Sequence, residues 1–283
     1  MAQGKIRIAT CQFAESFQPR RNGAMVIRYL RRAHRAGADL VHFHEGAMTG
    51  YLARKGAPDP ADYDWTALRE ATEGVMAQAR RLGLWVALGS AHPLTPPHRP
   101  TNCLYLIGPD GKIRDRYDKR FCTREDCRAY TPGDRFVTFT LNGVKCALLI
   151  CFDLRFPELY RRLSALGVQA VIQSFHNGYM DGPGVHEHIM RQTMQAHCGM
   201  NGFWASVANS SGYYSRWPGV FIRPDGVIGR SLPRNRAGMM VNTIDRARKF
   251  YDPIGPVRNL AMAGQLHSGR LVKDARQRRT KSL

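Results

Sequence analysis

Hydrophobic and polar residues alternate along the first third of the chain with two periods, one typical of strands and one of helices. Strands are expected at residues 5–13, 39–45 and 84–92, and helices at residues 21–36 and 64–82. In the first of these helices Val26, Leu30 and Ala33 fall on one face, with arginines on the other faces. The order strand, helix, strand, helix, strand predicts an α/β fold.

Turn signals become frequent further along the chain. The sequence GPDG at 108–111 and the pair Asn142-Gly143 each predict a β-hairpin. The hairpin strands are expected at 102–107, 112–117, 135–141 and 144–150. Helices are then expected at 157–166 and 185–200, strands at 168–174 and 203–209, and two short strands around the RPDG turn at 223–226. No change of composition marks a linker, so the pattern predicts one domain.

The composition is that of a globular protein, since 43% of the 283 residues are hydrophobic and 23% are charged. The longest apolar run, residues 146–152, is far shorter than the roughly 20 residues that a membrane helix needs. The first residues lack the pattern of a signal peptide. The seven cysteines form no C-x-x-C pair, which argues against a zinc ribbon or a thioredoxin-like centre. We therefore expect a cytoplasmic protein that has no membrane partner.

The net charge of +20 raises the question of nucleic-acid binding. Of the 42 basic residues 34 are arginine, and they are scattered along the whole chain without a nucleic-acid motif. We therefore interpret the charge as a solvated basic surface and expect no nucleic-acid partner. Residues 268–283 carry six basic residues and one acid. They are interpreted as a basic tail, either a mobile arm or a segment that packs on a partner subunit.

Three reactive side chains stand at the ends of predicted strands. Cys151 follows the apolar segment VKCALLI and precedes Pro157, a favourable first residue of a helix. This is where α/β enzymes place nucleophiles, and a helix N-terminus with a nearby cation would lower the pKa of the thiol. Glu45 fits a general base, and Lys119 fits a compact positive charge. By themselves the three also fit a buried structural cysteine, a solvent-facing acid and a surface lysine.

The segments around these residues, HEGAMTGY, YDKRF and ICFDLRFPELYR, resemble in order and spacing the three signature blocks of the nitrilase superfamily, the carbon-nitrogen hydrolases. The resemblance extends from the first strand to the strands near residue 225. It implies a four-layer αββα sandwich, with two mixed sheets flanked by helices, in a carbon-nitrogen hydrolase domain at residues 1–267. Residues 268–283 would then form the tail. The resemblance also implies a homodimer or a larger homo-oligomer.

The resemblance assigns roles as well. Glu45 is the expected general base, Lys119 the cation that stabilises the oxyanion, and Cys151 the nucleophile that forms a thioester. The expected substrate-binding residues include Phe152, through its backbone N–H, together with His176 and Asn177. For His176 a local structural role is the alternative. This chemistry requires neither a metal nor an organic cofactor, so we expect none.

Two positions depart from the family pattern. His44 precedes the expected base where the family usually has proline, so it would alter the local turn or add a polar group. The family also tends to place a second acid several residues before a Pro-Gly pair, here Pro132 and Gly133. Glu125 has the usual residue type and Asp126 the commoner spacing. We favour Asp126 as the acid that helps to hold the substrate or water.

The sequence Cys-Phe-Asp at the nucleophile differs from the Cys-Trp-Glu of true nitrilases and resembles the amidase and carbamoylase branches. We therefore expect hydrolysis of a small linear amide or an N-carbamoyl compound, with release of ammonia or an amine. A nitrile is the alternative substrate. Two further hypotheses stay open: a non-catalytic basic binding or assembly protein, and a papain-like hydrolase that uses a cysteine and a histidine. The charged residues Asp153, Arg155 and Glu158 are interpreted as a network that fixes the loop after the nucleophile.

Overall fold

The structure of the protein is a computed structural model that describes residues 4–281. Its contacts divide the chain into two compact units, the first ending at Tyr251 and the second beginning at Asp252. The second unit contains the short helices α6 (Gly255–Met262) and α7 (Ala275–Arg278). The domain boundary predicted after residue 267 stays a prediction. All candidate site residues belong to the first unit.

The first sheet has the strand order β12-β1-β2-β3-β4-β5. Its strands are β1 (Lys5–Gln12), β2 (Leu40–His42), β3 (Trp85–His92), β4 (Thr101–Ile107), β5 (Ile113–Asp118) and β12 (Gly238–Asp245). Strands β1, β2 and β3 are parallel, as the alternation with helices predicts, and β4 and β5 continue as antiparallel strands. Strand β12, which was not predicted, pairs antiparallel with β1 along its whole length.

The second sheet has the strand order β11-β10-β9-β8-β7-β6. Its strands are β6 (Thr138–Leu141), β7 (Val144–Ile150), β8 (Ala170–Ser174), β9 (Trp204–Ala208), β10 (Val220–Ile222) and β11 (Ile228–Ser231). Strands β7, β8 and β9 are parallel. Strand β6 pairs antiparallel with β7, β10 pairs antiparallel with β9, and β11 pairs antiparallel with β10. The predicted Asn142-Gly143 hairpin joins β6 to β7, with both turn residues at positive φ.

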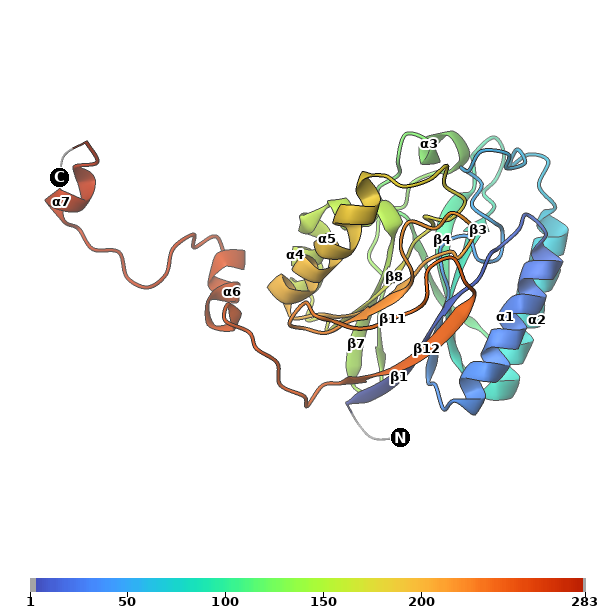
Figure 1. Cartoon of the computed structure of the whole chain (residues 1–283), viewed down its shortest axis with the longest axis horizontal. Helices are drawn as coiled ribbons and strands as arrows, with labels where there is room; N and C mark the ends of the chain where they lie inside the picture. The colour runs from blue at the N-terminus through green and yellow to red at the C-terminus, as the bar shows by residue number, and fades with distance from the viewer. Residues whose placement is uncertain (1–3, 282–283) are drawn as a thin grey trace. The chain divides into compact units, whose positions relative to one another are not determined.

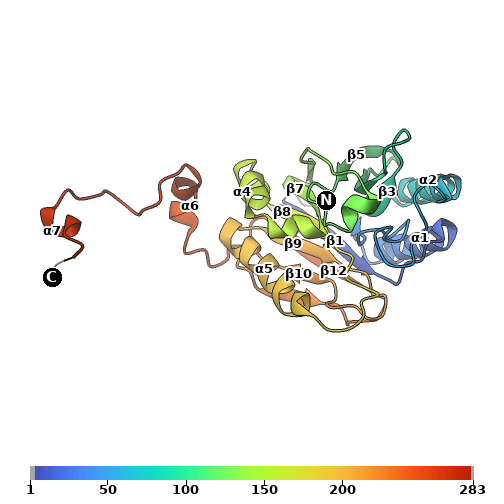
Figure 2. The ribbon, with the colours of Figure 1, turned by 90° about the horizontal axis from the view of Figure 1, so that it is seen from above.

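The two sheets face each other between two pairs of helices (Figure 1). Helices α1 (Pro19–Arg35) and α2 (Trp65–Leu82) cover the first sheet, and α4 (Pro157–Ala165) and α5 (Val185–Asn201) cover the second, as Figure 2 shows from above. The cores follow these layers: Ile8 and Leu104 of the first sheet share a core with Leu148 of the second. Val41 shares a separate core with Leu30 of α1. The predicted four-layer αββα sandwich is confirmed.

A short polar seam is buried between the two sheets. His42, the last residue of β2, places Nδ1 2.9 Å from Ser206 Oγ and Nε2 2.9 Å from Ser174 Oγ. Thr10 Oγ1 lies 2.7 Å from the same Ser206 oxygen. Burial, assisted by the neighbouring His44, lowers the pKa of His42 to about 3. A neutral imidazole therefore joins β2 to β8 and β9.

Acidification should destabilise the protein through His42. The unfolded imidazole titrates near 6.5, whereas the folded one stays neutral down to about pH 3, so the unfolded state takes up a proton first. Lowering the pH from 7 to 5 should cost the wild type about 2 kcal/mol of unfolding free energy through this group. His42→Gln has no imidazole at this position and does not lose this free energy. The deficit in its unfolding free energy relative to wild type should therefore shrink as the pH falls. Urea unfolding at both pH values measures the deficit, and a deficit independent of pH would contradict the expectation.

Candidate active site

Cys151 occupies a sharp turn at the end of β7. The strand ends at Ile150, and a five-residue 3₁₀ helix begins at Cys151 itself. The backbone φ of Cys151 is +44°, in the left-handed region that residues with a Cβ rarely adopt. Strained backbone of this kind is concentrated at functional sites. The chain thus forms a strand-to-helix elbow at the cysteine without the flanking glycines that usually mark such an elbow in a sequence.

Asp153 holds this elbow in place. The backbone N–H of Ile150 and the Tyr117 hydroxyl donate to its Oδ2 at 3.0 and 2.7 Å, and the backbone N–H of Phe121 donates to its Oδ1 at 3.0 Å. Burial raises the pKa of Asp153 to about 6, although these hydrogen bonds lower it. Asp153 was predicted to form a charge network with Arg155 and Glu158. The prediction is wrong for these two residues, because both are exposed and no ion pair joins either of them to Asp153.

Glu45 lies in the turn that follows β2. This turn packs closely against β3, since a Cβ on Gly89 would stand only 1.9 Å from the His44 carbonyl oxygen. The buried Oε1 of Glu45 accepts hydrogen bonds from Asn102 Nδ2 at 2.7 Å and from Lys119 Nζ at 2.9 Å. Its Oε2 is also buried and accepts no hydrogen bond from the described residues. One carboxylate oxygen therefore remains available to take a proton.

Lys119 follows β5 and is completely buried. Its Nζ donates to Glu45 Oε1 at 2.9 Å and to Asp126 Oδ2 at 2.8 Å, where Asp126 begins the short helix α3 (Asp126–Ala129). Burial lowers the pKa of Lys119, but Glu45, Cys151, Tyr51 and Asp126 outweigh burial and hold that pKa well above its usual value. Burial raises the pKa of Asp126, and Lys119 with Tyr51 brings it below its usual value. A charged ammonium is therefore fixed beside ionised Asp126.

The pKa of the Cys151 thiol lies well above its ordinary value, so the prediction of a lowered pKa is wrong. Burial raises this pKa most, and the Glu45 carboxylate raises it further. Lys119 and a hydrogen bond from the His176 backbone lower it without reversing the shift. The cation that the sequence places near the thiol is accompanied by two carboxylates, Glu45 and Asp126. Cys151 therefore needs a base before it can act as a nucleophile.

Cys151 opens onto a cavity of about 420 Å³, within the range of small-molecule sites. Three of the predicted substrate-binding residues line this cavity: Phe152, His176 and Asn177. Asn177 Nδ2 lies 4.0 Å from Cys151 Sγ. The two candidate second acids take different places, because Glu125 is exposed on the cavity wall whereas Asp126 is buried against Lys119. The role predicted for Asp126, that it helps to hold the substrate or water, stays a prediction.

A second buried acid, Glu15, holds the ring of His176. His176 Nε2 lies 2.8 Å from Glu15 Oε1, and Ser210 Oγ donates to Glu15 Oε2 at 2.6 Å. Burial raises the pKa of Glu15, but His176, His44 and Ser210 together lower it to about 2. The buried ring of His44 lies 3.9 Å from the same carboxylate, so this residue does add a polar group beside the site. No hydrogen bond joins the His176 ring to the Cys151 thiol.

Three residues of the site escaped the sequence analysis. They are Asn102, which holds Glu45; Glu15, which holds His176; and Tyr51. The Tyr51 hydroxyl donates to Asp126 Oδ1 at 2.6 Å, and its ring stacks on His176 with centroids 4.7 Å apart. Asn102 carried a signal, because it is a polar residue within the buried strand TNCLYLI. Tyr51 and Glu15 lie between regular elements, where no periodicity marks them.

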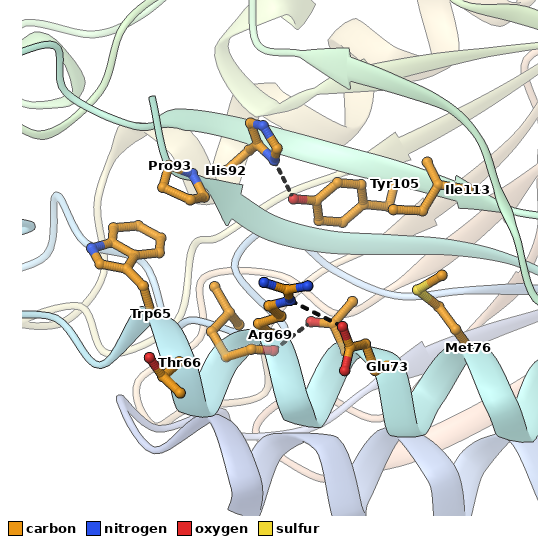
Figure 3. Close-up of a pocket in the computed structure, with 11 residues that line it drawn as sticks. Trp65, Thr66, Arg69, Glu73, Met76, His92, Pro93, Tyr105 and Ile113 are labelled. Carbon is orange, nitrogen blue, oxygen red and sulfur yellow. Dashed lines mark hydrogen bonds and ion pairs between the residues drawn. The ribbon is translucent and has the colours of Figure 1, made fainter. Parts of the chain in front are cut away.

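A second cavity, of about 490 Å³, lies between α2 and the edge of the first sheet (Figure 3). Arg69 and Glu73 of α2 form an ion pair at 3.0 Å on its wall, and His92 Nδ1 lies 2.7 Å from the Tyr105 hydroxyl. None of the predicted site residues lines this cavity. The cavity at Cys151 is therefore the candidate active site.

Within residues 4–281, no three His, Cys, Asp or Glu side chains gather in a way that could hold a metal ion. No helix in the same part of the chain is both long enough and apolar enough to cross a membrane.

The chain belongs to the carbon-nitrogen hydrolase family, whose profile matches residues 7–249. An (R)-stereoselective amidase of a Pseudomonas species is 29% identical over 237 residues, which cover 80% of this chain and 82% of that protein. A hydrolase of Mycobacterium tuberculosis is 32% identical over 188 residues; the match covers 61% of this chain and spans only 62% of the length of that relative. The human omega-amidase is 25% identical over 194 residues, covering 65% of this chain and 68% of that enzyme.

Solved structures share the fold. The amidase of a Nesterenkonia species superposes with a TM-score of 0.75 at 22% identity, covering 87% of this chain and 92% of that one. A variant of an amidase from Nesterenkonia, with the acetamide moiety of fluoroacetamide added covalently at its active-site cysteine, has a TM-score of 0.77 at 22% identity, covering 93% and 98%. The predicted membership of the nitrilase superfamily is confirmed.

The raised pKa of Cys151 predicts a slow reaction with small thiol reagents. At pH 7, methyl methanethiosulfonate should modify Cys151 at least about tenfold more slowly than the exposed Cys127. Glu45→Gln should speed the modification of Cys151, because it removes a negative charge that raises the thiol pKa. Glu125→Gln, on the exposed cavity wall, serves as the control and should leave the rate unchanged. Peptide mapping over time gives each rate; faster modification of Cys151 than of Cys127 in the wild type would refute the raised pKa.

Proposed function

We propose that the protein hydrolyses the carbon–nitrogen bond of a small linear amide or N-carbamoyl compound through a thioester on Cys151. The observation that carries this proposal is the buried Oε2 of Glu45, a carboxylate oxygen without a hydrogen-bond partner in a site that also holds a neutral thiol and a charged lysine. A neutral thiol requires a base, and Glu45 is the acid whose charge acts most strongly on Cys151.

In the first half of the proposed reaction Glu45 takes the proton of the Cys151 thiol as Sγ attacks the amide carbon. The electron pair of the carbonyl moves to oxygen, and Lys119 with the backbone N–H of Phe152 stabilises that oxyanion. The carbon–nitrogen bond then breaks, and Glu45 returns the proton to the leaving nitrogen. Ammonia or an amine departs, and the acyl group stays on Cys151 as a thioester.

In the second half Glu45 takes a proton from water, whose oxygen attacks the thioester carbon. The carbon–sulfur bond breaks, the acid leaves, and the proton returns to the Cys151 thiolate. The elbow held by Asp153 supports this scheme because it fixes Sγ relative to Lys119, whose loop is tied to the same carboxylate through Phe121.

The substrate proposal draws on the relatives. Those named as amidases, including the Pseudomonas and human enzymes, favour an amide over a nitrile. The papain-like alternative finds no support, since the His176 ring is bonded to Glu15 rather than to Cys151. A non-catalytic role is also disfavoured, because Glu45 keeps a buried oxygen without a hydrogen-bond partner among the described residues, which is costly in a purely structural cluster. The homo-oligomer, the cytoplasmic location and the absence of a nucleic-acid partner stay predictions.

The proposal is tested by ammonia release from a panel of small amides, N-carbamoyl compounds and nitriles. Cys151→Ala should abolish turnover, Glu45→Gln should lower it by about 10²–10⁴, and Lys119→Met by about 10²–10³. Lys112→Met, an exposed lysine of the β4–β5 hairpin, is the matched control and should stay within about twofold. Intact mass after incubation of Glu45→Gln with substrate should reveal an acyl adduct on Cys151. Turnover that survives in Cys151→Ala would refute the proposal.

A further inference from the structure

The cavity at Cys151 carries positive charges that have no acidic partner. Four permanently basic residues line it: Arg54, Lys55, Arg155 and Arg216. Two acids, Glu125 and Asp181, line the same wall, and no ion pair joins any of the four cations to a carboxylate within residues 4–281. The cavity that receives the substrate therefore presents an excess of uncompensated positive charge.

The other cavity, at the edge of the first sheet, differs in this respect. In the cavity of Figure 3, Arg69 is paired with Glu73 at 3.0 Å, so that wall is electrically balanced. Arg116 and Arg223 are likewise paired with Asp118 and Asp225 at 2.8 and 2.6 Å. Because the four cations around Cys151 outnumber the two acids of the same wall and pair with neither, they point to a negatively charged ligand.

Arg54 is held between two aromatic rings. Its guanidinium carbon lies 4.6 Å from the ring centroid of Phe17 and 4.0 Å from that of Tyr179, so two aromatic rings flank it. Tyr179 is fixed by a hydrogen bond from its hydroxyl to the Glu15 carbonyl and by close contact with Gly212, where a Cβ would stand 2.2 Å from the ring. Stacking holds the planar fork of donors in one orientation, which suits a planar carboxylate.

Arg216 is held on the α5 side of the cavity. Its Nε donates to the Gly182 carbonyl, and its Nη1 lies 3.4 Å from His186 Nδ1. Burial lowers the pKa of His186, and Arg216 and Arg155 lower it further, so this histidine is neutral and can accept a hydrogen bond from Arg216. Both contacts orient the guanidinium without neutralising it, and its charge remains available to a ligand.

We propose that the substrate is an amide that also carries a carboxylate, with the amide carbon at Cys151 and the carboxylate bound by Arg54 and Arg216. This inference rests on the proposed function and specifies its substrate class. A cavity of about 420 Å³ suits a small molecule such as the monoamide of a short dicarboxylic acid. Neutral amides leave the arginines unpaired, and cationic amides are repelled by them.

The test compares three series of equal chain length: monoamides of succinate, glutarate and adipate, the neutral alkanamides, and the cationic ω-aminoalkanamides. Ammonia release should give the anionic series a kcat/KM at least about tenfold above the neutral series, with the cationic series lowest. Added salt should lower kcat/KM for the anionic series only.

The variants assign the effect to residues. Arg54→Gln should lower kcat/KM for the anionic series by at least about tenfold, mainly through KM, and leave the neutral series within about twofold. Arg216→Gln should act in the same direction, and it carries the test if Arg54→Gln does not fold. Arg69→Gln, in the cavity of Figure 3, is the matched control and should change neither series.

The outcomes separate this inference from the proposed function. If neutral amides are hydrolysed as well as anionic ones, the inference is overturned and amide hydrolysis stands. If both arginine variants reduce the two series equally, the assignment of the carboxylate to Arg54 and Arg216 is overturned. If no amide of any charge is hydrolysed, the proposed function fails and this inference fails with it.

Discussion

The candidate active site depends on one buried cation held between two buried carboxylates. Lys119 contacts Glu45 at 2.9 Å and Asp126 at 2.8 Å, and all three side chains are removed from solvent. Burying charges is expensive, and pairing offsets that cost only where the geometry is held. Lys119 follows β5, Glu45 lies in the turn after β2, and Asp126 begins α3. The cluster therefore holds together loops that are far apart in the chain, and removal of Lys119 would leave two buried carboxylates without their cation.

The same cluster divides the site into two electrostatic regions. Glu45 and Asp126 against Lys119 leave one negative charge in excess beside Cys151. The cavity wall formed by Arg54, Arg216 and their basic neighbours is positive. A substrate with a neutral amide at one end and a negative charge at the other would be turned by this field before it makes any close contact. The arginines would then bind one end of the substrate, and Cys151 would react with the other end.

Much of the fold could be predicted because its signals are local. The strand and helix periods, the two hairpin turns and the three signature blocks all lie within short segments, and the structure confirms the elements they predict. Strand β12 was missed because it exists through its pairing with β1, more than 200 residues away in the sequence. Glu15 and Tyr51 were missed because they lie between regular elements, where no periodicity marks them, and because their partners lie in other loops. The prediction of a lowered pKa for Cys151 was wrong because it considered only a helix N-terminus and a nearby cation. The burial of the thiol, together with the charge of Glu45, outweighs Lys119.

The neutral thiol of Cys151 has a consequence for the life of the protein in the cell. Peroxide attacks thiolates rather than thiols, and oxidation beyond the sulfenic acid is largely irreversible. In the proposed reaction Cys151 gives up its proton to Glu45 only as it attacks a substrate, so it would spend little time in the vulnerable form. The burial and negative charge that raise the pKa of Cys151 would therefore also protect it from oxidative damage between turnovers.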